Sequence, residues 1–582
     1  MNRIQLVVLC LFLSVIFTSC AQVRARDVWA DETLSQLSLR DKIAQMVHVR
    51  MPGKFINRQS KEFKKVEELV RGSHIGGLTL FAGNVYESAI LLNDFQDISK
   101  LPLLVSSDFE RGAAFRIEDS TSFPWTMAIG AAGDEELAYR QGLVTARESR
   151  AMGVHWIFAP VVDVNNNPDN PVINIRAFGS DPADVSRFGV AFIRGAQAGG
   201  VLATAKHFPG HGDTSVDSHN NMPVLEASME RLESVEFVPF RRAIEAGVDA
   251  VMTAHIAVPQ LTKGAKIPGT LSPDILTDVL KNTLGFRGIV VTDAMEMAGI
   301  TKQYGNGPAA VAAVKAGVDV LLLPPDAEEA INAIELAVKS GEISEKRIDE
   351  SVIKILDAKQ RLRLHENRKT NIEKIGDLVS SPENIELADE IAARAVAVIK
   401  DEKRLLPLNP EDKRRVYGLV LTPAINSESG AAFLNAFREK FPGAQTEWAN
   451  ARIPEDQLAA IEKAIAAADV VVVATLSRLT TGRTIGIPDR HVNIMKKLAS
   501  LKKPVIWVCL GNPYLMRTAP DIGTILCTFS YSENSQEAAV KALAGEFRVS
   551  GKMPVTVPGV AEIGDGLVIP PREITVSGEN KN

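Results

Sequence analysis

The sequence predicts an α/β protein with two domains, a (β/α)₈ barrel of the TIM type followed by an α/β sandwich. Two observations predict this fold class. Short β-branched runs alternate with longer amphipathic stretches after the N-terminal segment, which is typical of a parallel sheet covered by helices. In the first part of the chain these runs number eight, and several of them end in polar or titratable residues.

The composition excludes several classes of protein. The 582 residues allow two to four domains of about 150 residues. With 46% hydrophobic and 23% charged residues, the chain is neither disordered nor collagenous. A net charge of −6 gives no sign of a basic surface, so we expect no nucleic acid as a partner. Four cysteines in this length exclude a fold built on disulfide bonds.

Residues 1–20 have the pattern of an export signal. Arg3 supplies a positive charge, and Ile4–Phe17 is an apolar run too short for a membrane span of about 20 residues. Thr18-Ser19-Cys20 then resembles the cleavage box of bacterial lipoproteins, which implies that Cys20 is the lipidation site. We therefore expect an exported, membrane-anchored lipoprotein in the periplasm or on the cell surface. An ordinary signal peptide cut nearby is the alternative.

The barrel is predicted over residues 27–365. Helical patterns such as Glu135–Met152 and Met229–Ala246 separate the apolar runs, and eight strand–helix units over roughly 330 residues suit this fold with inserted loops. The eight runs are Ala44–Arg50, Gly76–Phe81, Leu103–Asp108, His155–Val164, Val201–His207, Asp249–His255, Gly288–Asp293 and Asp319–Leu323.

Polar residues gather at the C-terminal ends of five of these runs. They are Asp108, Asp163, Lys206-His207, His255 and Asp293. Because the C-terminal ends of barrel strands form the mouth of the active site, this pattern predicts a catalytic cup.

A second domain is predicted over residues 387–575, after a charged, turn-rich linker at 366–386. Helices such as Pro454–Ala468 separate its apolar runs, which indicates an open, doubly wound sheet. Cys509 and Cys527 lie in two of the runs and are expected to be buried free thiols. The runs are Ala395–Ile399, Val416–Leu421, Val470–Thr475, Pro504–Leu510 and Thr524–Phe529.

The densest polar segment runs from Lys206 to His219 and contains three of the nine histidines. His207 and His211 are four residues apart, which is the spacing of metal ligands on a helix. The intervening Pro-Gly pair and the glycine after His211 oppose a helix there. We therefore expect a loop that follows a strand and surrounds a small ligand, without a metal or other cofactor; a metal site is the alternative.

Two groups are candidates for acid–base and nucleophilic chemistry. Asp217 and His219 are two residues apart, and a carboxylate beside an imidazole fixes its tautomer and raises its basicity. The alternative is that the pair only fastens the loop. Asp293 ends a buried run, which suits a nucleophile. Capping of the following helix is the alternative role for it.

The polar segment resembles a known signature. Lys206–Thr214 with Asp217-Ser218-His219 is similar to the KHFPGHG…DSH motif of glycoside hydrolase family 3, in its β-N-acetylglucosaminidase branch. The resemblance covers about residues 30–365 and implies a barrel followed by a sandwich, which is one architecture of that family. Three more segments match family motifs in order: Asn167–Gly179 the sugar-binding loop, Val251–His255 the sixth-strand motif, and Asp293–Met297 the nucleophile segment.

The resemblance also implies roles for individual residues. Asp293 is the nucleophile, His219 the acid/base, and Asp217 the residue that orients it. The residues expected to bind the sugar are Asp108, Arg176, Lys206, His207 and His255.

One segment departs from the family pattern. Where the family usually has Asp-Gln-Glu-Gly-Gly, this chain has Asp108-Phe109-Glu110-Arg111-Gly112, which affects the expected shape of the pocket for the non-reducing end.

These roles imply a retaining exo-β-N-acetylglucosaminidase that acts through a covalent glycosyl-aspartate. Export favours peptidoglycan fragments as the carbohydrate substrate, with chitooligosaccharides second. Because a neutral imidazole repels an anion less than a carboxylate does, a phosphorylase is one alternative. A β-glucosidase-type exo-glycosidase is another. A non-catalytic glycan-binding lipoprotein is a third, which the presence of Asp293, Asp217 and His219 opposes. The sequence makes no prediction of oligomeric state.

Overall fold

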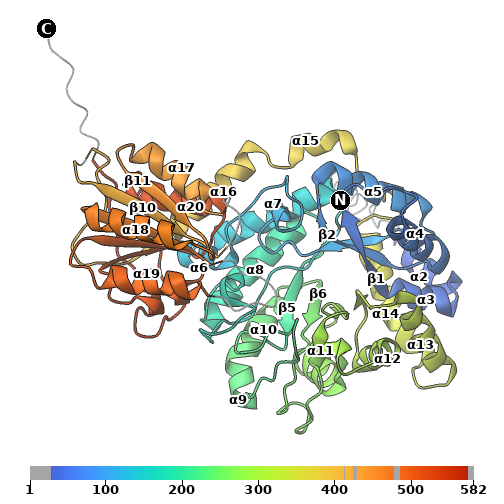
Figure 1. Ribbon diagram of the computed structural model, residues 1–582. Helices are drawn as coiled ribbons and strands as arrows, with labels where there is room; N and C mark the ends of the chain where they lie inside the picture. The colour runs from blue at the N-terminus through green and yellow to red at the C-terminus, as the bar shows by residue number, and fades with distance from the viewer. Residues whose placement is uncertain (1–27, 412, 424–428, 478–485, 574–582) are drawn as a thin grey trace, which may run out of the picture.

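The computed structural model describes residues 28–411, 413–423, 429–477 and 486–573. Two α/β bodies lie beside each other, the larger one formed by the first part of the chain and the smaller one by the second (Figure 1). The expected signal segment and Cys20 lie outside the described residues. Within the ranges given above, no helix is both long and apolar enough to cross a membrane.

The larger body is a closed barrel of eight parallel strands, as predicted. Five strands form one sheet in the order β4-β3-β2-β1-β8, and β5, β6 and β7 form a second sheet. Isolated parallel bridges from Trp156 to Leu202 and from Val291 to Val320 join the two sheets at both edges. The strands are β1 Val47–Gly53, β2 Gly77–Gly83, β3 Leu104–Ser107, β4 Trp156–Ile157, β5 Thr204–Phe208, β6 Ala250–Thr253, β7 Ile289–Val291 and β8 Leu321–Leu322.

Helices surround the barrel and begin at residues that cap them. Asp134 accepts the Glu136 N–H before α7, and Asp181 accepts two N–H groups before α8, whose first residue is Pro182. The helices are α2 Trp29–Gln36, α3 Leu39–Gln45, α4 Lys61–Glu68, α5 Val85–Ile98, α6 Thr126–Ala132, α7 Glu135–Ala151, α8 Pro182–Ala198, α9 Met229–Arg231, α10 Phe237–Glu245, α11 Ala298–Thr301, α12 Asn306–Ala316, α13 Ala327–Lys339 and α14 Glu345–Arg361, with π-helical turns η1 Leu69–Ser73, η4 Leu232–Glu236 and η6 Asp274–Thr283 and 3₁₀ turns η2 Ala113–Phe115, η3 Asn174–Arg176 and η5 Gly269–Leu271.

The segment that connects the two domains is packed on the barrel. It contains η7 Ile372–Lys374, α15 Ile375–Leu378 and the start of α16 Pro382–Ala395. The buried carboxyl group of Glu148, on α7, accepts hydrogen bonds from Ser380 N at 2.9 Å, Asn384 Nδ2 at 2.9 Å and Thr121 N at 3.1 Å. These bonds hold the connecting segment against the barrel wall.

The smaller body is a doubly wound sandwich, as predicted. Its strand order is β11-β10-β12-β13-β14-β9, and all pairs are parallel except β14 with β9. Successive residues of the central strand alternate between two apolar cores: Val472 packs with Phe433 and Phe437 of α17, whereas Val471 and Val473 face the other side. The elements are β9 Ala397–Asp401, β10 Val416–Leu421, α17 Ala431–Lys440, β11 Gln445–Ala449, α18 Glu455–Ala467, β12 Val470–Leu476, α19 Asp489–Ala499, β13 Val505–Leu510, η8 Pro513–Thr518, β14 Thr524–Cys527 and α20 Glu533–Leu543.

Two features of the sandwich differ from the sequence expectations or refine them. The edge strand β11 was not expected, because its residues are mostly polar and only its last one is buried. Cys509 and Cys527 are buried free thiols, as predicted, and they are partners in register on β13 and β14.

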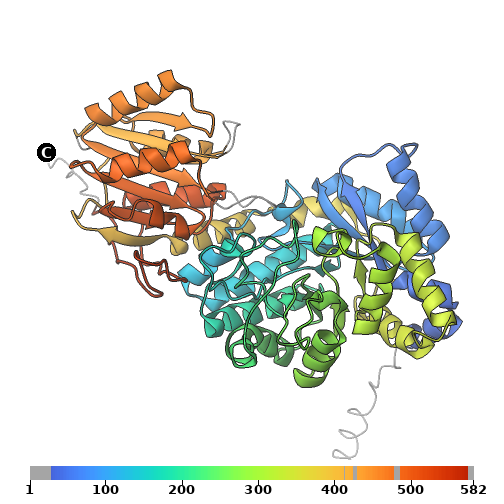
Figure 2. The same cartoon turned by 60° about the horizontal axis from the view of Figure 1, so that its bottom comes forward.

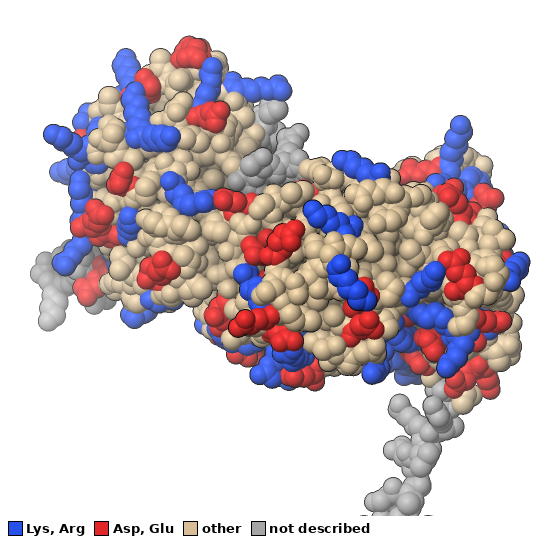
Figure 3. Space-filling view, turned by 90° about the horizontal axis from the view of Figure 1, so that it is seen from below, with Lys and Arg blue, Asp and Glu red and all other residues tan. Residues whose placement is uncertain are grey.

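The two bodies make close backbone contacts near the C-terminal ends of the barrel strands. Ser180 N donates to Pro554 O, and Lys552 N donates to Ala131 O, each at 3.0 Å. A Cβ atom on Gly179 would lie 2.6 Å from Pro554 O, so only glycine permits this approach. Figure 2 shows the sandwich against one side of the barrel. Acidic and basic side chains are interspersed over the barrel face in Figure 3.

Candidate active site

A cavity of about 1110 Å³ opens at the C-terminal ends of the barrel strands. Its lining includes residues of both domains, with Pro423, Gly486 and Tyr531 from the sandwich. Seven of the eight residues predicted to act on substrate line it: Asp108, Arg176, Lys206, His207, Asp217, His219 and Asp293.

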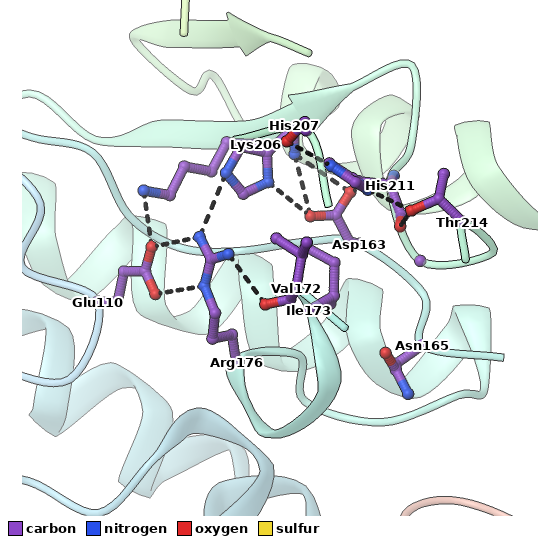
Figure 4. Close-up of polar contacts among 12 residues, drawn as sticks. Glu110, Asp163, Asn165, Val172, Ile173, Arg176, Lys206, His207, His211 and Thr214 are labelled. Carbon is purple, nitrogen blue, oxygen red and sulfur yellow. Dashed lines mark hydrogen bonds and ion pairs between the residues drawn. The ribbon is translucent and has the colours of Figure 1, made fainter. Parts of the chain in front are cut away.

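One end of the cavity is built by a chain of ion pairs. Lys206 Nζ, on β5, lies 2.8 Å from both Asp108 Oδ1 and Glu110 Oε1, which follow β3. Arg176 donates two hydrogen bonds to the Glu110 carboxylate, at 2.7 and 2.9 Å (Figure 4). Arg116 donates to the second oxygen of Asp108 at 2.8 Å. Each acid thus accepts hydrogen bonds from two cations, which fixes its orientation.

The charges of these ion-paired side chains stabilise one another. Burial alone raises the pKa of Asp108, but Lys206 and Arg116 outweigh it and hold the pKa below its ordinary value. The same balance, with Arg176 and Lys206 as partners, keeps the pKa of Glu110 low. Despite burial, the nearby carboxylates raise the pKa of Lys206 and of Arg176. All four side chains are therefore charged, which suits binding of sugar hydroxyls.

His207 connects these ion-paired side chains to Asp163. Its Nδ1 lies 2.7 Å from Asp163 Oδ2, and its Nε2 lies 3.3 Å from Arg176 Nη2 (Figure 4). The Asp163 carboxylate also accepts the backbone N–H groups of His207 and His211. Burial raises the pKa of Asp163, but His207 and His211 outweigh it and leave the pKa below its ordinary value. Asp163 therefore anchors the start of the loop after β5.

The loop after β5 is held by a buried histidine. His211 Nδ1 lies 2.6 Å from Thr214 Oγ1, and Nε2 lies 3.0 Å from Ser218 Oγ. Burial lowers the pKa of His211 to about 4, so the ring is neutral near pH 7. Since the bonds of His211 go to hydroxyl groups, this loop does not present the pair of metal ligands considered above. Among the residues whose placement is described, no group of three or more His, Cys, Asp or Glu side chains is arranged to hold a metal ion.

Asp217 and His219 form a pair near the end of this loop. His219 Nδ1 lies 2.8 Å from Asp217 Oδ1, and the same oxygen accepts the His219 backbone N–H at 2.8 Å. The His219 side chain is 37% exposed, whereas that of Asp217 is 8% exposed. A fixed carboxylate that orients a partly exposed imidazole is the arrangement of a general acid–base group.

Asp293 follows β7 and faces the same cavity. Its backbone N–H donates to Thr253 O, and its Oδ1 accepts the Ala294 N–H at 2.7 Å. Burial raises the pKa of Asp293, but His207, His255, His219 and the Ala294 N–H outweigh it and leave the pKa lowered. The next helix, α11, begins only at Ala298 with Met297 as its N-cap, so Asp293 does not cap it.

Comparison with known proteins identifies the family. The glycosyl hydrolase family 3 N-terminal domain matches residues 38–358, and the family 3 C-terminal domain matches residues 395–572. The chain belongs to glycoside hydrolase family 3. It is a glycoside hydrolase of the family that the resemblance implied.

Relatives and solved structures cover nearly the whole length of this family 3 enzyme. A β-N-acetylglucosaminidase/β-glucosidase of Cellulomonas fimi is 28% identical over 90% of this chain and 95% of its own. A family 3 β-N-acetylglucosaminidase structure from Paenibacillus sp. str. FPU-7 is 32% identical, with a TM-score of 0.81 over 90% of this chain and 99% of that one. A β-glucoside phosphorylase structure is 25% identical, with a TM-score of 0.82 over 91% and 96%.

The expectation that His255 binds sugar does not match its position in the family 3 fold. His255 is fully buried and does not line the cavity. Its Nδ1 lies 2.8 Å from Thr270 Oγ1, and its Nε2 lies 3.0 Å from Ala294 O. Burial lowers the pKa of His255. Its contact with Ala294 O therefore supports the turn that contains Asp293.

Several residues of the site were not assigned from sequence. Glu110 and Asp163 each hold two parts of the site together, and the signal for Asp163 was its position near a strand end. Asn170 was not considered: its Nδ2 donates to His211 O and Gly212 O, and its Oδ1 accepts the N–H groups of Val172 and Ile173. It thereby connects the loop that carries Arg176 to the loop that carries His219.

The departure in the Asp108–Gly112 segment has two different consequences. Phe109 is buried in the core, so it does not alter the cavity. Arg111 lines the cavity, and its guanidinium carbon lies 5.3 Å from the ring centre of Trp125 and 5.8 Å from that of Phe115. Arg111 thus adds a positive charge to the cavity lining at a position where the family usually has glycine.

Proposed function

We propose that this family 3 enzyme is a retaining exo-β-N-acetylglucosaminidase that uses Asp293 as nucleophile and His219 as acid/base. The observation that carries the proposal is that Asp293 and the Asp217–His219 pair line one cavity, although they come from different strands and loops. A nucleophile and a proton donor on opposite sides of one glycosidic bond are what double displacement requires.

In the first step, Asp293 attacks the anomeric carbon and forms a glycosyl ester. Its lowered pKa keeps the carboxylate ionised and ready to attack. The protonated His219 gives a proton to the departing oxygen. Because its Nδ1 faces Asp217, Nε2 is the nitrogen that serves this oxygen.

In the second step, His219 removes a proton from water, and the resulting hydroxide equivalent displaces Asp293 from the anomeric carbon. Asp217 stabilises the imidazolium that forms and holds its ring in place. The sugar leaves with retained configuration, and both side chains return to their starting states.

The charged end of the cavity is the proposed site for the terminal sugar. Asp108 and Lys206 stand side by side there, and Arg176 and His207 adjoin them. Such fixed donors and acceptors match the hydroxyl groups of a pyranose ring. The β-N-acetylglucosaminidase names of the Cellulomonas relative and of the Paenibacillus structure support N-acetylglucosamine as that sugar.

The natural substrate is proposed to be peptidoglycan fragments, with chitooligosaccharides second. This choice rests on the export signal and Cys20 lipidation expected from the sequence, because an exported lipoprotein would meet peptidoglycan fragments outside the cytoplasm. Release of N-acetylglucosamine from purified muropeptides and from chitobiose, measured side by side, decides between the two.

The nucleophile is tested by Asp293→Ala, with the exposed Asp278→Ala as matched control. We expect Asp293→Ala to reduce kcat on an aryl N-acetyl-β-glucosaminide by on the order of 10⁴-fold or more, while Asp278→Ala leaves it unchanged. Mass spectrometry of the wild type with a slow fluorinated substrate is expected to find the sugar on the peptide that contains Asp293. Near-normal activity of Asp293→Ala would refute the assignment.

A phosphorylase is the second candidate, and the Asp217–His219 pair favours it. In the second step a neutral imidazole repels an incoming phosphate less than a carboxylate would. One structural neighbour is a β-glucoside phosphorylase. Product analysis with and without phosphate separates the two reactions, since phosphorolysis yields the sugar 1-phosphate. The aryl β-glucoside, assayed in parallel, tests the glucosidase activity that the Cellulomonas relative's name includes.

A further inference from the structure

A buried polar connection crosses the junction between the two domains and ends at the candidate sugar site. Asn165 and Asn174 belong to the barrel loop that follows β4, and Asn512 and Tyr514 belong to the start of η8 in the sandwich. All four side chains are buried. We call this set the junction cluster.

The junction cluster is linked by hydrogen bonds. Asn165 Nδ2 donates to Tyr514 Oη at 2.8 Å, and Tyr514 Oη lies 3.3 Å from the Asn165 carbonyl oxygen. Asn165 Oδ1 accepts the Asn174 N–H at 2.8 Å. Asn174 Nδ2 donates to Asn512 Oδ1 at 3.3 Å, and that oxygen also accepts the Tyr514 N–H at 3.0 Å. Partners from the sandwich therefore accept a side-chain N–H of each barrel asparagine.

The cluster sets the conformation of the turn that presents Arg176. Asn174 has a left-handed backbone with φ +44°, which asparagine adopts more readily than most residues. It is the first residue of η3, and Arg176 is the last. From there the Arg176 guanidinium reaches Glu110 and His207 (Figure 4). A shift of Asn174 would therefore move the guanidinium in the cavity.

We infer that Tyr514 and Asn512 are positioning residues for Arg176, so that the sandwich domain fixes the sugar end of a site built on the barrel. The physical reason is that a buried donor without a partner is costly. Without the Tyr514 hydroxyl, Asn165 must find water or rotate, and the 165–176 loop relaxes with it. As far as the inference concerns sugar binding, it rests on the proposed function.

The test uses Tyr514→Phe in the full chain, with Arg517→Gln as matched control. Arg517 lies on the same turn, and its Nη2 forms an exposed ion pair with Asp169 at 2.6 Å. For hydrolysis of an aryl N-acetyl-β-glucosaminide, we expect Tyr514→Phe to raise KM by about three- to tenfold with kcat within about twofold. Arg517→Gln is expected to change neither.

Double substitution separates positioning from general destabilisation. In an Arg176→Lys background, Tyr514→Phe is expected to raise KM by less than about twofold more, because both changes act on one contact. Effects on KM that multiply, or a lowered Tm with an unchanged KM, would overturn the inference.

Hydrogen exchange gives a readout that does not need activity. Tyr514→Phe is expected to speed amide exchange in residues 165–176 clearly more than Arg517→Gln does, because Arg517 touches this loop only through its exposed ion pair with Asp169. If the wild type proves inactive on every N-acetylglucosaminide, the proposed function fails, and exchange still decides whether the sandwich holds this loop. Unchanged exchange in Tyr514→Phe would overturn the inference.

Discussion

The site contains two aspartate–histidine pairs of nearly equal geometry and different surroundings. Asp163–His207 and Asp217–His219 have Nδ1–Oδ distances of 2.7 and 2.8 Å. The His207 side chain is 6% exposed and its Nε2 faces Arg176, whereas the His219 side chain is 37% exposed. Proton exchange with substrate and water needs an accessible nitrogen, so only the second pair suits acid–base catalysis.

The comparison teaches that the same two residue types serve different ends according to what surrounds them. Both aspartates accept backbone N–H groups as well as a ring, but Asp163 joins the backbones of two separate residues, His207 and His211, so the first pair is part of the loop framework. Asp217 accepts bonds from His219, and that pair projects into the cavity. A histidine motif alone does not distinguish these roles; access to the cavity does.

The largest expected effect is a difference between His219→Ala and His207→Ala in how the loss of kcat/KM depends on the leaving group. Loss of the proton donor should reduce kcat/KM by about 10²–10⁴-fold on glycosides with poor leaving groups and far less on activated aryl glycosides. His207→Ala should reduce kcat/KM by similar factors on glycosides with poor and with activated leaving groups, because His207 affects sugar binding. A leaving-group series measured on both variants checks this. Equal losses in His219→Ala across the series would break the comparison.

The next effect concerns stability and its pH dependence. The lowered pKa of Asp163 means that its charge stabilises the fold above the unfolded value of about 3.9, and that this contribution disappears as pH falls through the lower folded value. Asp163→Asn should therefore cost about 1–3 kcal/mol near pH 7.

Thermal unfolding from pH 7 to pH 3 measures this contribution. The Tm gap between wild type and Asp163→Asn should narrow below about pH 4. A gap that stays constant across this range would show that the Asp163 charge does not stabilise the fold.

The smallest effect concerns the acid limb of activity. Because the pKa of Asp293 is lowered, the acid limb of kcat/KM should lie below about pH 3.9. His207 lowers the pKa of Asp293 more than His219 does. His207→Gln should therefore move the acid limb of kcat/KM to higher pH by up to about one unit, and His219→Gln should move it by less. Profiles on an activated aryl glycoside measure both, and the reverse order would contradict the prediction.

Much of the fold could be predicted because its signals are local. The barrel strands appear as apolar runs, although the run His155–Val164 contributes only Trp156–Ile157 to β4. The edge strand β11 escaped prediction because solvent faces most of it, which removes the apolar run. The antiparallel direction of β9 depends on the path of the whole chain rather than on its own residues.

The site was predictable where chemistry coincides with a strand end or a motif. Lys206 and Asp293 met both conditions. Glu110 did not, because its role depends on Arg176, 66 residues away, and on the fold that brings them together. His255 stands at the end of a strand-like run, as an active-site residue would. In the fold, however, its ring contacts Thr270 and Ala294 and is buried, and no local sequence pattern reveals this burial.

The carboxyl group of Glu148 has a consequence for how the two domains are connected. Thr121 of the barrel and two residues of the connecting segment, Ser380 and Asn384, donate to this one buried group, and pulling the segment away would leave its carboxylate without these partners. The start of α16 is therefore fastened to α7 of the barrel. Because α16 leads directly into β9, the sandwich begins at a point that the barrel holds in place.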